Sequence, residues 1–281
     1  MKILVTGTAG FIGSAVAKTL LDRGDELIGI DNLNDYYDVQ LKQDRLARLL
    51  DHTNYTHMTQ DIEDPVAMAG IFQSHQPQRV VHLAAQPGVR YSLDNPQIYV
   101  QSNIVGFLNI LEGCRNGRVE HLVYASTSSV YGANTHMPYS VEQNVNHPLS
   151  LYAATKKSNE VMAHCYSHLF QIPMSGLRFF TVYGPWTRPD MALMKFTRNM
   201  IAGESIDVFN YGHHRRDFTY VDDIVEGIVR TLDKIAAPNA LWNSDQPDPA
   251  SSSAPWRLYN IGSNRPVELS RYIEVLERCL G

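Results

Sequence analysis

Three glycines near the start of the sequence have a spacing that can bind a phosphate group. Gly7, Gly10 and Gly13 follow a short apolar segment and precede a helical pattern, which Phe11 and Ile12 open. Glycine lets the chain turn tightly and lets the backbone approach a pyrophosphate, whose charge then lies at the positive end of the following helix. The spacing is GxxGxxG, not GxGxxG. The strand–turn–helix context is what favours a dinucleotide-binding turn over ordinary turn glycines.

An acidic residue follows at the end of the next expected strand, about 20 residues further on, as in dinucleotide-binding folds. At that place Asp31 can accept hydrogen bonds from both ribose hydroxyls and repel a 2′-phosphate, so the sequence favours NAD over NADP. We place Asn32 in the same site. The alternative interpretation is that Asp31 only caps the loop 32–38.

Two further segments stand at expected strand ends, where open α/β sheets bind ligands. Asp61 and Ile62 are placed to reach an adenine edge. Ala84 and Ala85 are small enough to let a cofactor pass beside them, with Gln86 next in line. Taken alone, each segment is more typical of a structural role than of a functional one.

A second motif pairs a phenol with an amine. Tyr152 and Lys156 are four residues apart, which on a helix puts both side chains on one face. The cation is then expected to lower the pKa of the phenol and make it a usable base near neutral pH. A helical YxxxK is common by chance, but this one follows a strand that ends in Ser126–Ser129, whose hydroxyls could bind a substrate alcohol. The alternative is that these hydroxyls only cap the strand end.

The elements that must position these residues alternate along the chain. Short β-branched runs separated by longer helical stretches are typical of βαβ units around a parallel sheet. The expected strands are 2–6, 26–31, 55–60, 79–84, 121–126 and 174–180, and the expected helices are 11–23, 65–76, 96–115 and 151–170. Gly24 is expected to end the first helix as a left-handed C-cap. After residue 181 the pattern predicts helices 193–203, 221–234 and 269–280, a strand 257–262 and a loop 245–255.

This alternation predicts a Rossmann-type α/β fold with a doubly wound parallel sheet, and the change of pattern after residue 181 indicates a smaller C-terminal lobe. We expect residues 1–180 to form the NAD-binding domain. Residues 181–281 are expected to form the substrate-binding lobe, partly interleaved with the first domain.

The composition excludes several classes of protein. With 44% hydrophobic and 19% charged residues the chain can bury a sizeable core. Its 29 acidic residues exceed its 24 Lys plus Arg, so nucleic acid and anionic membranes are not expected partners. The three cysteines are far apart and odd in number, which favours a reducing compartment, and we expect a cytoplasmic protein without an anchor. No metal site is expected. Glu160, His164 and His168 share one helix face, which we interpret as packing or solvated.

Six segments, in this order and spacing, resemble the extended short-chain dehydrogenase/reductase family of nucleotide-sugar enzymes: TGTAGFIG, LAAQPGVRYS, YASTSSVYG, YAATKKSNE, LRFFTVYGPW and RRDFTYVDD. The resemblance covers nearly the whole chain. Four further phrases look like the UDP-glucuronate 4-epimerase branch of that family: DNLNDYYD, STSSVYG, GPWTRPDMA and SAPWRLYNIG.

The resemblance implies a role for each residue that matches a family motif. Tyr152 corresponds to the family's base, Lys156 to the lysine that binds the nicotinamide ribose, and Thr127 to the hydroxyl that shares the O4 proton of the substrate. The implied contacts to the substrate are made by seven residues. Ser128, Ser129, Thr181 and Arg188 would face the uronate carboxylate, and Arg90, Lys195 and Arg216 the nucleotide diphosphate.

The resemblance has two departures and leaves alternatives open. Thr187 stands where the branch usually has glycine, and similar proteins run on past Gly281, so the chain is C-terminally truncated or the pocket is unusually open. At the segment STSSVYG, UDP-glucuronate decarboxylases typically read STSEVYG, with an acid in place of Ser129. The 4,6-dehydratases typically read STDEVYG, with acids in place of both Ser128 and Ser129. UDP-glucose 4-epimerase is a third alternative, and a catalytically silent NAD-sensing scaffold is a fourth, of another class. The family also implies a homodimer through the helices 96–115 and 151–170.

Overall fold

Seven parallel strands form the central sheet of the molecule. The computed structural model describes residues 1–281, apart from the side chains of residues 209 and 210. The strands are β1 (Lys2–Thr6), β2 (Glu26–Asp31), β3 (Tyr55–Thr59), β4 (Arg79–His82), β5 (His121–Thr127), β6 (Met174–Phe179) and β9 (Trp256–Ile261). Their order is β3-β2-β1-β4-β5-β6-β9, so the direction of winding reverses between β1 and β4. The expected doubly wound α/β fold is confirmed, and ligands bind such sheets at this reversal.

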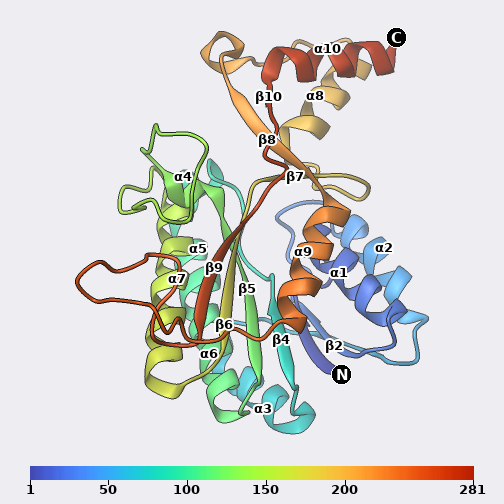
Figure 1. Cartoon of the computed structure of the whole chain (residues 1–281). Helices are drawn as coiled ribbons and strands as arrows, with labels where there is room; N and C mark the ends of the chain where they lie inside the picture. The colour runs from blue at the N-terminus through green and yellow to red at the C-terminus, as the bar shows by residue number, and fades with distance from the viewer.

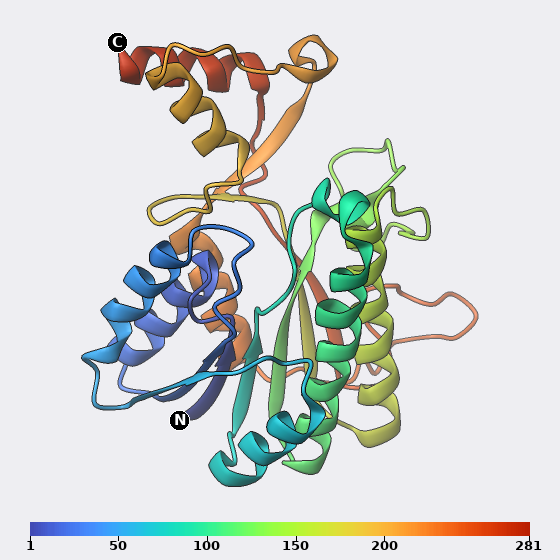
Figure 2. The same cartoon turned by 180° about the vertical axis from the view of Figure 1, so that it is seen from behind.

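Helices cover both faces of the sheet (Figures 1 and 2). One face carries α1 (Phe11–Asp22), α2 (Val39–Leu50) and α9 (Val221–Asp233). The other carries α3 (Pro65–His75), α5 (Pro96–Val100), α6 (Gly106–Asn116) and α7 (Leu151–Phe170). Each face has its own apolar core, one containing Val16 and Leu20 of α1, the other Phe107 and Ile110 of α6. The expected C-cap of α1 is confirmed, because Gly24 has φ +92°.

The single helix expected at 96–115 is interrupted near its middle. A π-helical turn, Gln101–Val105, joins α5 to α6. Its Asn103 is buried, accepts the Gln86 N–H through Oδ1 (2.8 Å) and donates Nδ2 to Thr155 (3.1 Å). Turns of this kind are frequent at functional sites. Here the turn ties the end of β4 to the helix that carries Tyr152.

A second, smaller lobe stands beyond the carboxyl edge of the sheet (Figure 1). It contains a three-stranded sheet, β10-β8-β7, built from β7 (Thr181–Tyr183), β8 (Arg215–Tyr220) and β10 (Pro266–Glu268). Two helices accompany it, α8 (Ala192–Ile201) and α10 (Leu269–Leu280). Short helical segments complete the molecule: α4 (Tyr91–Asp94), Ser128–Tyr131 and Phe209–Gly212. The division at residue 180 stays a proposal, since α9 and β9 follow it in sequence but pack within the larger lobe.

Residues 39–50, to which the sequence assigned no element, form the helix α2. Its buried positions are Lys42, Arg45, Leu46 and Leu49, which is the i, i+3, i+4, i+7 stripe of an amphipathic helix. Two of the four are cations, so the stripe does not show in a pattern of apolar residues. No helix formed by the described residues is both long enough and apolar enough to cross a membrane.

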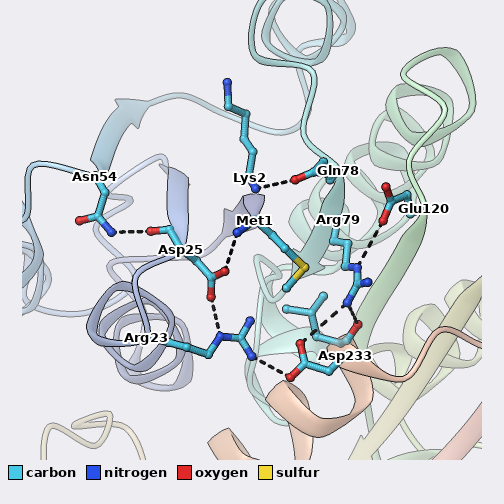
Figure 3. A network of polar contacts seen from close by, with 10 residues as sticks. Met1, Lys2, Arg23, Asp25, Asn54, Gln78, Arg79, Glu120 and Asp233 are labelled. Atoms are coloured by element: carbon cyan, nitrogen blue, oxygen red, sulfur yellow. Dashed lines mark hydrogen bonds and ion pairs between the residues drawn. The ribbon is translucent and has the colours of Figure 1, made fainter.

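A polar network joins residues at the amino edge of the sheet (Figure 3), at the opposite end from the small lobe (Figure 1). Arg79, at the start of β4, donates Nη1 to the Leu232 carbonyl (2.8 Å) near the end of α9. The same side chain lies 3.6 Å from Glu120 and 3.8 Å from Asp233. Arg23, just after α1, contacts Asp233 at 2.7 Å. The network fixes the end of α9 against α1 and the strands.

Candidate active site

A cavity of about 620 Å³ opens at the carboxyl ends of the strands, between the two lobes. Its wall is formed by the glycine turn, the ends of β2, β4 and β5, the start of α7 and the segment between β7 and α8. The structure brings together twenty of the predicted residues in that wall: Gly7, Gly10, Phe11, Ile12, Gly13, Asp31, Asn32, Asp61, Ile62, Ala84, Ala85, Arg90, Thr127, Ser128, Ser129, Tyr152, Lys156, Thr181, Arg188 and Arg216.

Two predicted residues lie outside this wall. Gln86 is buried behind it, where its backbone is paired with Asn103. Lys195 is exposed on α8, and its contact with a nucleotide stays a prediction.

The glycine turn has the geometry that a bound pyrophosphate needs. Gly7 has φ +80°, which favours glycine, and a Cβ on Gly13 would lie 1.9 Å from the Gly7 carbonyl oxygen. Gly10 is the N-cap of α1 and has no side chain to cap it, so the first N–H groups of the helix are open to an anion. The turn therefore fits the diphosphate of NAD.

Asp31 both supports the local loops and faces the cavity. Its Oδ2 accepts the Ala9 N–H (3.0 Å) and its Oδ1 accepts the Leu33 N–H (2.9 Å). A carboxylate has about four acceptor positions, so two remain for ribose hydroxyls. The capping role and the cofactor role are thus compatible. Beyond it, Asn32 donates to Asp61 (2.9 Å), which joins the ends of β2 and β3.

Tyr152 and Thr127 meet where the end of β5 faces the start of α7. Ser150 caps α7 by accepting the Ala153 N–H (3.1 Å), which places Tyr152 in the first turn. Thr127 Oγ1 accepts the Ser129 N–H (3.1 Å) and keeps its hydroxyl hydrogen for the Tyr152 oxygen.

The charge balance at the phenol differs from the expectation. Burial raises the pKa of Tyr152, and the hydrogen bond from Thr127 and the positive charge of Arg188 oppose it without reversing it. The expected lowering of the Tyr152 pKa by Lys156 is therefore wrong. Lys156 is itself buried, and burial lowers its pKa to about 8, against the opposing charge of Glu160.

A buried ion pair lies behind these residues and was missed from the sequence. Arg178 on β6 donates to both oxygens of Glu160 on α7, at 2.8 and 2.9 Å, and Ser126 donates to Glu160 at 2.7 Å. Burial raises the pKa of Glu160, but Arg178 brings it below its ordinary value overall. Glu160 is thus neither solvated nor simply packed, since it anchors α7 to the two strands beside the site.

The segment between β7 and α8 carries its own charge pair. Arg188 donates Nε to Asp190 Oδ1 (2.9 Å) and Nη2 to Oδ2, and Tyr36 donates to Asp190 at 3.2 Å. Burial raises the pKa of Asp190, and the ion pair with Arg188 lowers it below its ordinary value. The sequence pointed to Arg188 alone, although Asp190 stands two residues on. The same cavity that Arg188 lines is also lined by Ser128, Ser129 and Thr181.

Comparison with known proteins identifies a matching family and several similar proteins. The profile of the family described as NAD dependent epimerase/dehydratase matches residues 3–243. The chain is 57% identical over 281 residues to protein CapI of Staphylococcus aureus, covering 100% of this chain and 84% of that protein. It is 46% identical over 283 residues to a probable UDP-glucuronate 4-epimerase of Rhizobium meliloti, covering 100% and 83%. The crystal structure of a UDP-glucuronic acid 4-epimerase from Bacillus cereus with UDP-glucuronic acid and NAD has a TM-score of 0.85 and 34% identity, covering 99% of this chain and 82% of that one.

Proposed function

This chain belongs to the NAD-dependent epimerase/dehydratase family, with NAD as its cofactor, and we propose that it converts UDP-glucuronate to UDP-galacturonate by inverting C4. The observation that carries the proposal is the composition of the cavity wall beside Tyr152. Hydroxyls stand at Ser128, Ser129 and Thr181, with the cation Arg188 in the same cavity. Such a wall suits a sugar that bears a carboxylate.

Tyr152 and Thr127 handle the O4 proton. The phenolate of Tyr152 takes the proton from the sugar hydroxyl, and Thr127 donates a hydrogen bond that favours the charged form of the phenol. Lys156 holds the nicotinamide ribose next to them. When bound, NAD would supply the acceptor for the C4 hydride and the donor of the same hydride for the return transfer, after the 4-keto sugar has turned to present its other face. The net redox change is zero, so the cofactor is not consumed.

The uronate carboxylate has to survive the reaction. A sugar with a ketone at C4 and a carboxylate on C5 is a β-keto acid, which loses carbon dioxide when the carboxylate stands perpendicular to the carbonyl. Hydrogen bonds from Ser128, Ser129 and Thr181 would hold the carboxylate away from that alignment. Decarboxylases and 4,6-dehydratases carry acids at positions 128 or 129. A dehydratase needs an acid and a base at C5 and C6, which serine cannot supply near neutral pH.

The experiment is an NMR time course of the NAD-loaded full chain with UDP-glucuronate. UDP-galacturonate should grow in without release of carbon dioxide, and Tyr152→Phe should turn over ~10²–10⁴-fold more slowly with little change in UDP-sugar binding. Formation of UDP-xylose or a 4-keto pentose, or turnover of UDP-glucose alone, would falsify the assignment to UDP-glucuronate. A complete lack of turnover would favour the scaffold alternative.

We also propose a homodimer and a cytoplasmic location. Apolar side chains on α6 and α7 are exposed, among them Leu108, Val161 and Leu169, and packing against a second copy would cover them. Light scattering of the protein and of a Val161→Glu variant tests the dimer, which the variant should weaken. The three cysteines are free, which agrees with a reducing compartment.

A further inference from the structure

Arg45 is a fully buried cation that bridges the cofactor side and the sugar side of the cavity. It lies on α2, and all five of its N–H donors are used. Nη1 donates to the Ala9 carbonyl (3.0 Å) and to the Tyr37 hydroxyl (2.6 Å). Nε and Nη2 both donate to the Trp186 carbonyl (3.2 and 2.7 Å), and Nη2 also reaches the Thr187 carbonyl (3.3 Å).

The two ends of this bridge belong to segments that line different parts of the cavity. Ala9 lies within the glycine turn, and its N–H donates to Asp31, so its carbonyl moves with the dinucleotide site. Trp186 and Thr187 directly precede Arg188 in the wall of the sugar site. A single rigid guanidinium therefore spans the two halves of the cavity.

The segment around Trp186 needs an external hold. Trp186 has φ +65°, a left-handed conformation that costs free energy for a residue with a side chain. Trp186 is 41% exposed, and its ring packs on Arg48 at 5.0 Å. The two hydrogen bonds from Arg45 hold the backbone carbonyl of Trp186 directly.

Burying the charge of Arg45 costs free energy, which its hydrogen bonds offset. A buried cation whose donors lacked acceptors would be strongly destabilising. Here all of them are met by neutral oxygens, three of which are backbone carbonyls. The planar fork of arginine can join three carbonyls in fixed geometry, whereas the point charge of lysine cannot.

We propose that Arg45 is a positioning residue that couples occupancy of the dinucleotide site to the placement of Arg188. A dinucleotide that orders the glycine turn fixes the Ala9 carbonyl. Through the guanidinium it also fixes the carbonyls of Trp186 and Thr187. By linkage, ordering the sugar segment strengthens cofactor binding by the same factor. The inference rests on the proposed function only in the role that it gives to Arg188.

The test is amide hydrogen exchange of residues 184–192 in the full chain, stripped of NAD and then reloaded. In the parent protein NAD should slow exchange of this segment by about tenfold, within the usual range of coupling between sites. In Arg45→Lys and Arg45→Met the turn should still bind NAD, while the effect of NAD on residues 184–192 disappears. Turnover should fall together with this coupling, with a smaller change in the NAD dissociation constant.

Arg48→Met is the matched control. Arg48 lies on the same helix and stacks on the Trp186 ring at 5.0 Å, but it is not among the donors to the carbonyls. Its variant should keep the NAD-dependent protection. If Arg45→Met does not fold, Arg45→Lys decides, because it keeps the charge and most of the length. NAD-dependent protection that persists in Arg45→Lys, or that is absent from the parent, overturns the proposal. The exchange readout uses no sugar, so it fails or succeeds independently of the substrate assignment.

Discussion

At the scale of single residues, the phenol of Tyr152 is subject to opposing influences. Burial raises its pKa, and the hydrogen bond from Thr127 and the charge of Arg188 lower it. Because the base must lose its proton before it can accept one from the sugar, the reaction should speed up as pH rises through the pKa of Tyr152.

The first prediction concerns the hydroxyl of Thr127. Thr127→Val removes a hydrogen bond to the charged form of the phenol, so the pKa of Tyr152 should rise further. The ascending limb of kcat/KM against pH should therefore move to higher pH, and part of the lost activity should return in alkaline buffer. A pH profile of the NAD-loaded enzyme measures this. A uniform loss at every pH would mean that Thr127 acts by packing alone.

A second prediction concerns the carboxylate that pairs with Arg188. Asp190 forms an ion pair with the guanidinium of Arg188, to which the uronate carboxylate would bind. Both side chains are partly exposed. Asp190→Asn should lower KM for UDP-glucuronate by about two- to fivefold, the scale of such a pair. The turnover rate should fall as well, because a sugar that is held more tightly rotates more slowly within the site.

UDP-glucose is the control substrate for Asp190→Asn, because it lacks the carboxylate. Its KM should not fall in the variant. An equal change of KM for both sugars would show that Asp190 shapes the segment rather than competing for Arg188.

At the scale of elements, one face of α7 contributes both to the cavity and to the protein interior. Tyr152 and Lys156 face the cavity, and Glu160, one turn further on, pairs with Arg178 inside the protein. The ion pair orients the helix against β6, while Ser126 ties the same carboxylate to β5. The position of the base therefore depends on an ion pair whose two residues do not line the cavity.

The third prediction follows from that ion pair. Glu160→Gln leaves Arg178 buried without its counter-ion and should cost ~3–5 kcal/mol of unfolding free energy, measured by urea denaturation without cofactor. Replacing both residues with methionine should recover most of the loss. Lys157→Gln is the control, since Lys157 contacts the same carboxylate at 3.3 Å but is 26% exposed, and its loss should cost ~0–1 kcal/mol. A similar loss for Glu160→Gln and Lys157→Gln would contradict the role of the buried pair.

Sequence patterns predicted the buried strands best, since β1 and β2 begin and end as expected and consist largely of buried Val, Ile and Leu. The helices α7 and α10 also have the expected bounds, although the buried residues of α7 are mainly polar and α10 has none. The helix α2 was missed because Lys42 and Arg45 occupy half of its buried stripe. β8 was missed because its first residues, including Arg215, are charged and exposed.

The candidate site was predictable where a motif names the residue and not where a partner is far away in sequence. The glycine turn and the pair Tyr152 and Lys156 carry local signals. Glu160 and Arg178 are 18 residues apart, and Arg45 is 141 residues from Trp186, so neither contact leaves a local pattern. The pKa of Tyr152 is likewise decided by burial, which a motif does not report.

At the scale of the whole molecule, the two edges of the central sheet have different tasks. The carboxyl edge holds the glycine turn, Asp31 and the base, and its polar groups face a cavity. The amino edge holds the network around Arg79 and Asp233, whose polar groups face one another (Figure 3). Changes at the amino edge should therefore act on stability, and changes at the carboxyl edge on ligand binding.

The fourth prediction compares one substitution at each edge. Arg79→Met removes the hydrogen bond to the Leu232 carbonyl and leaves Glu120 and Asp233 without this partner, which should cost ~1–3 kcal/mol of unfolding free energy. Asp31→Asn keeps an oxygen for the Ala9 N–H but loses the charge, and should weaken NAD binding by about tenfold or more.

Urea denaturation must be done without NAD, because a bound ligand stabilises the folded state by itself. Calorimetric titration of the cofactor-free protein then gives the affinity. NAD binding that suffers more from Arg79→Met than from Asp31→Asn would show that the two edges are coupled, because the end of α9, which Arg79 holds, packs on the helix that begins at the glycine turn.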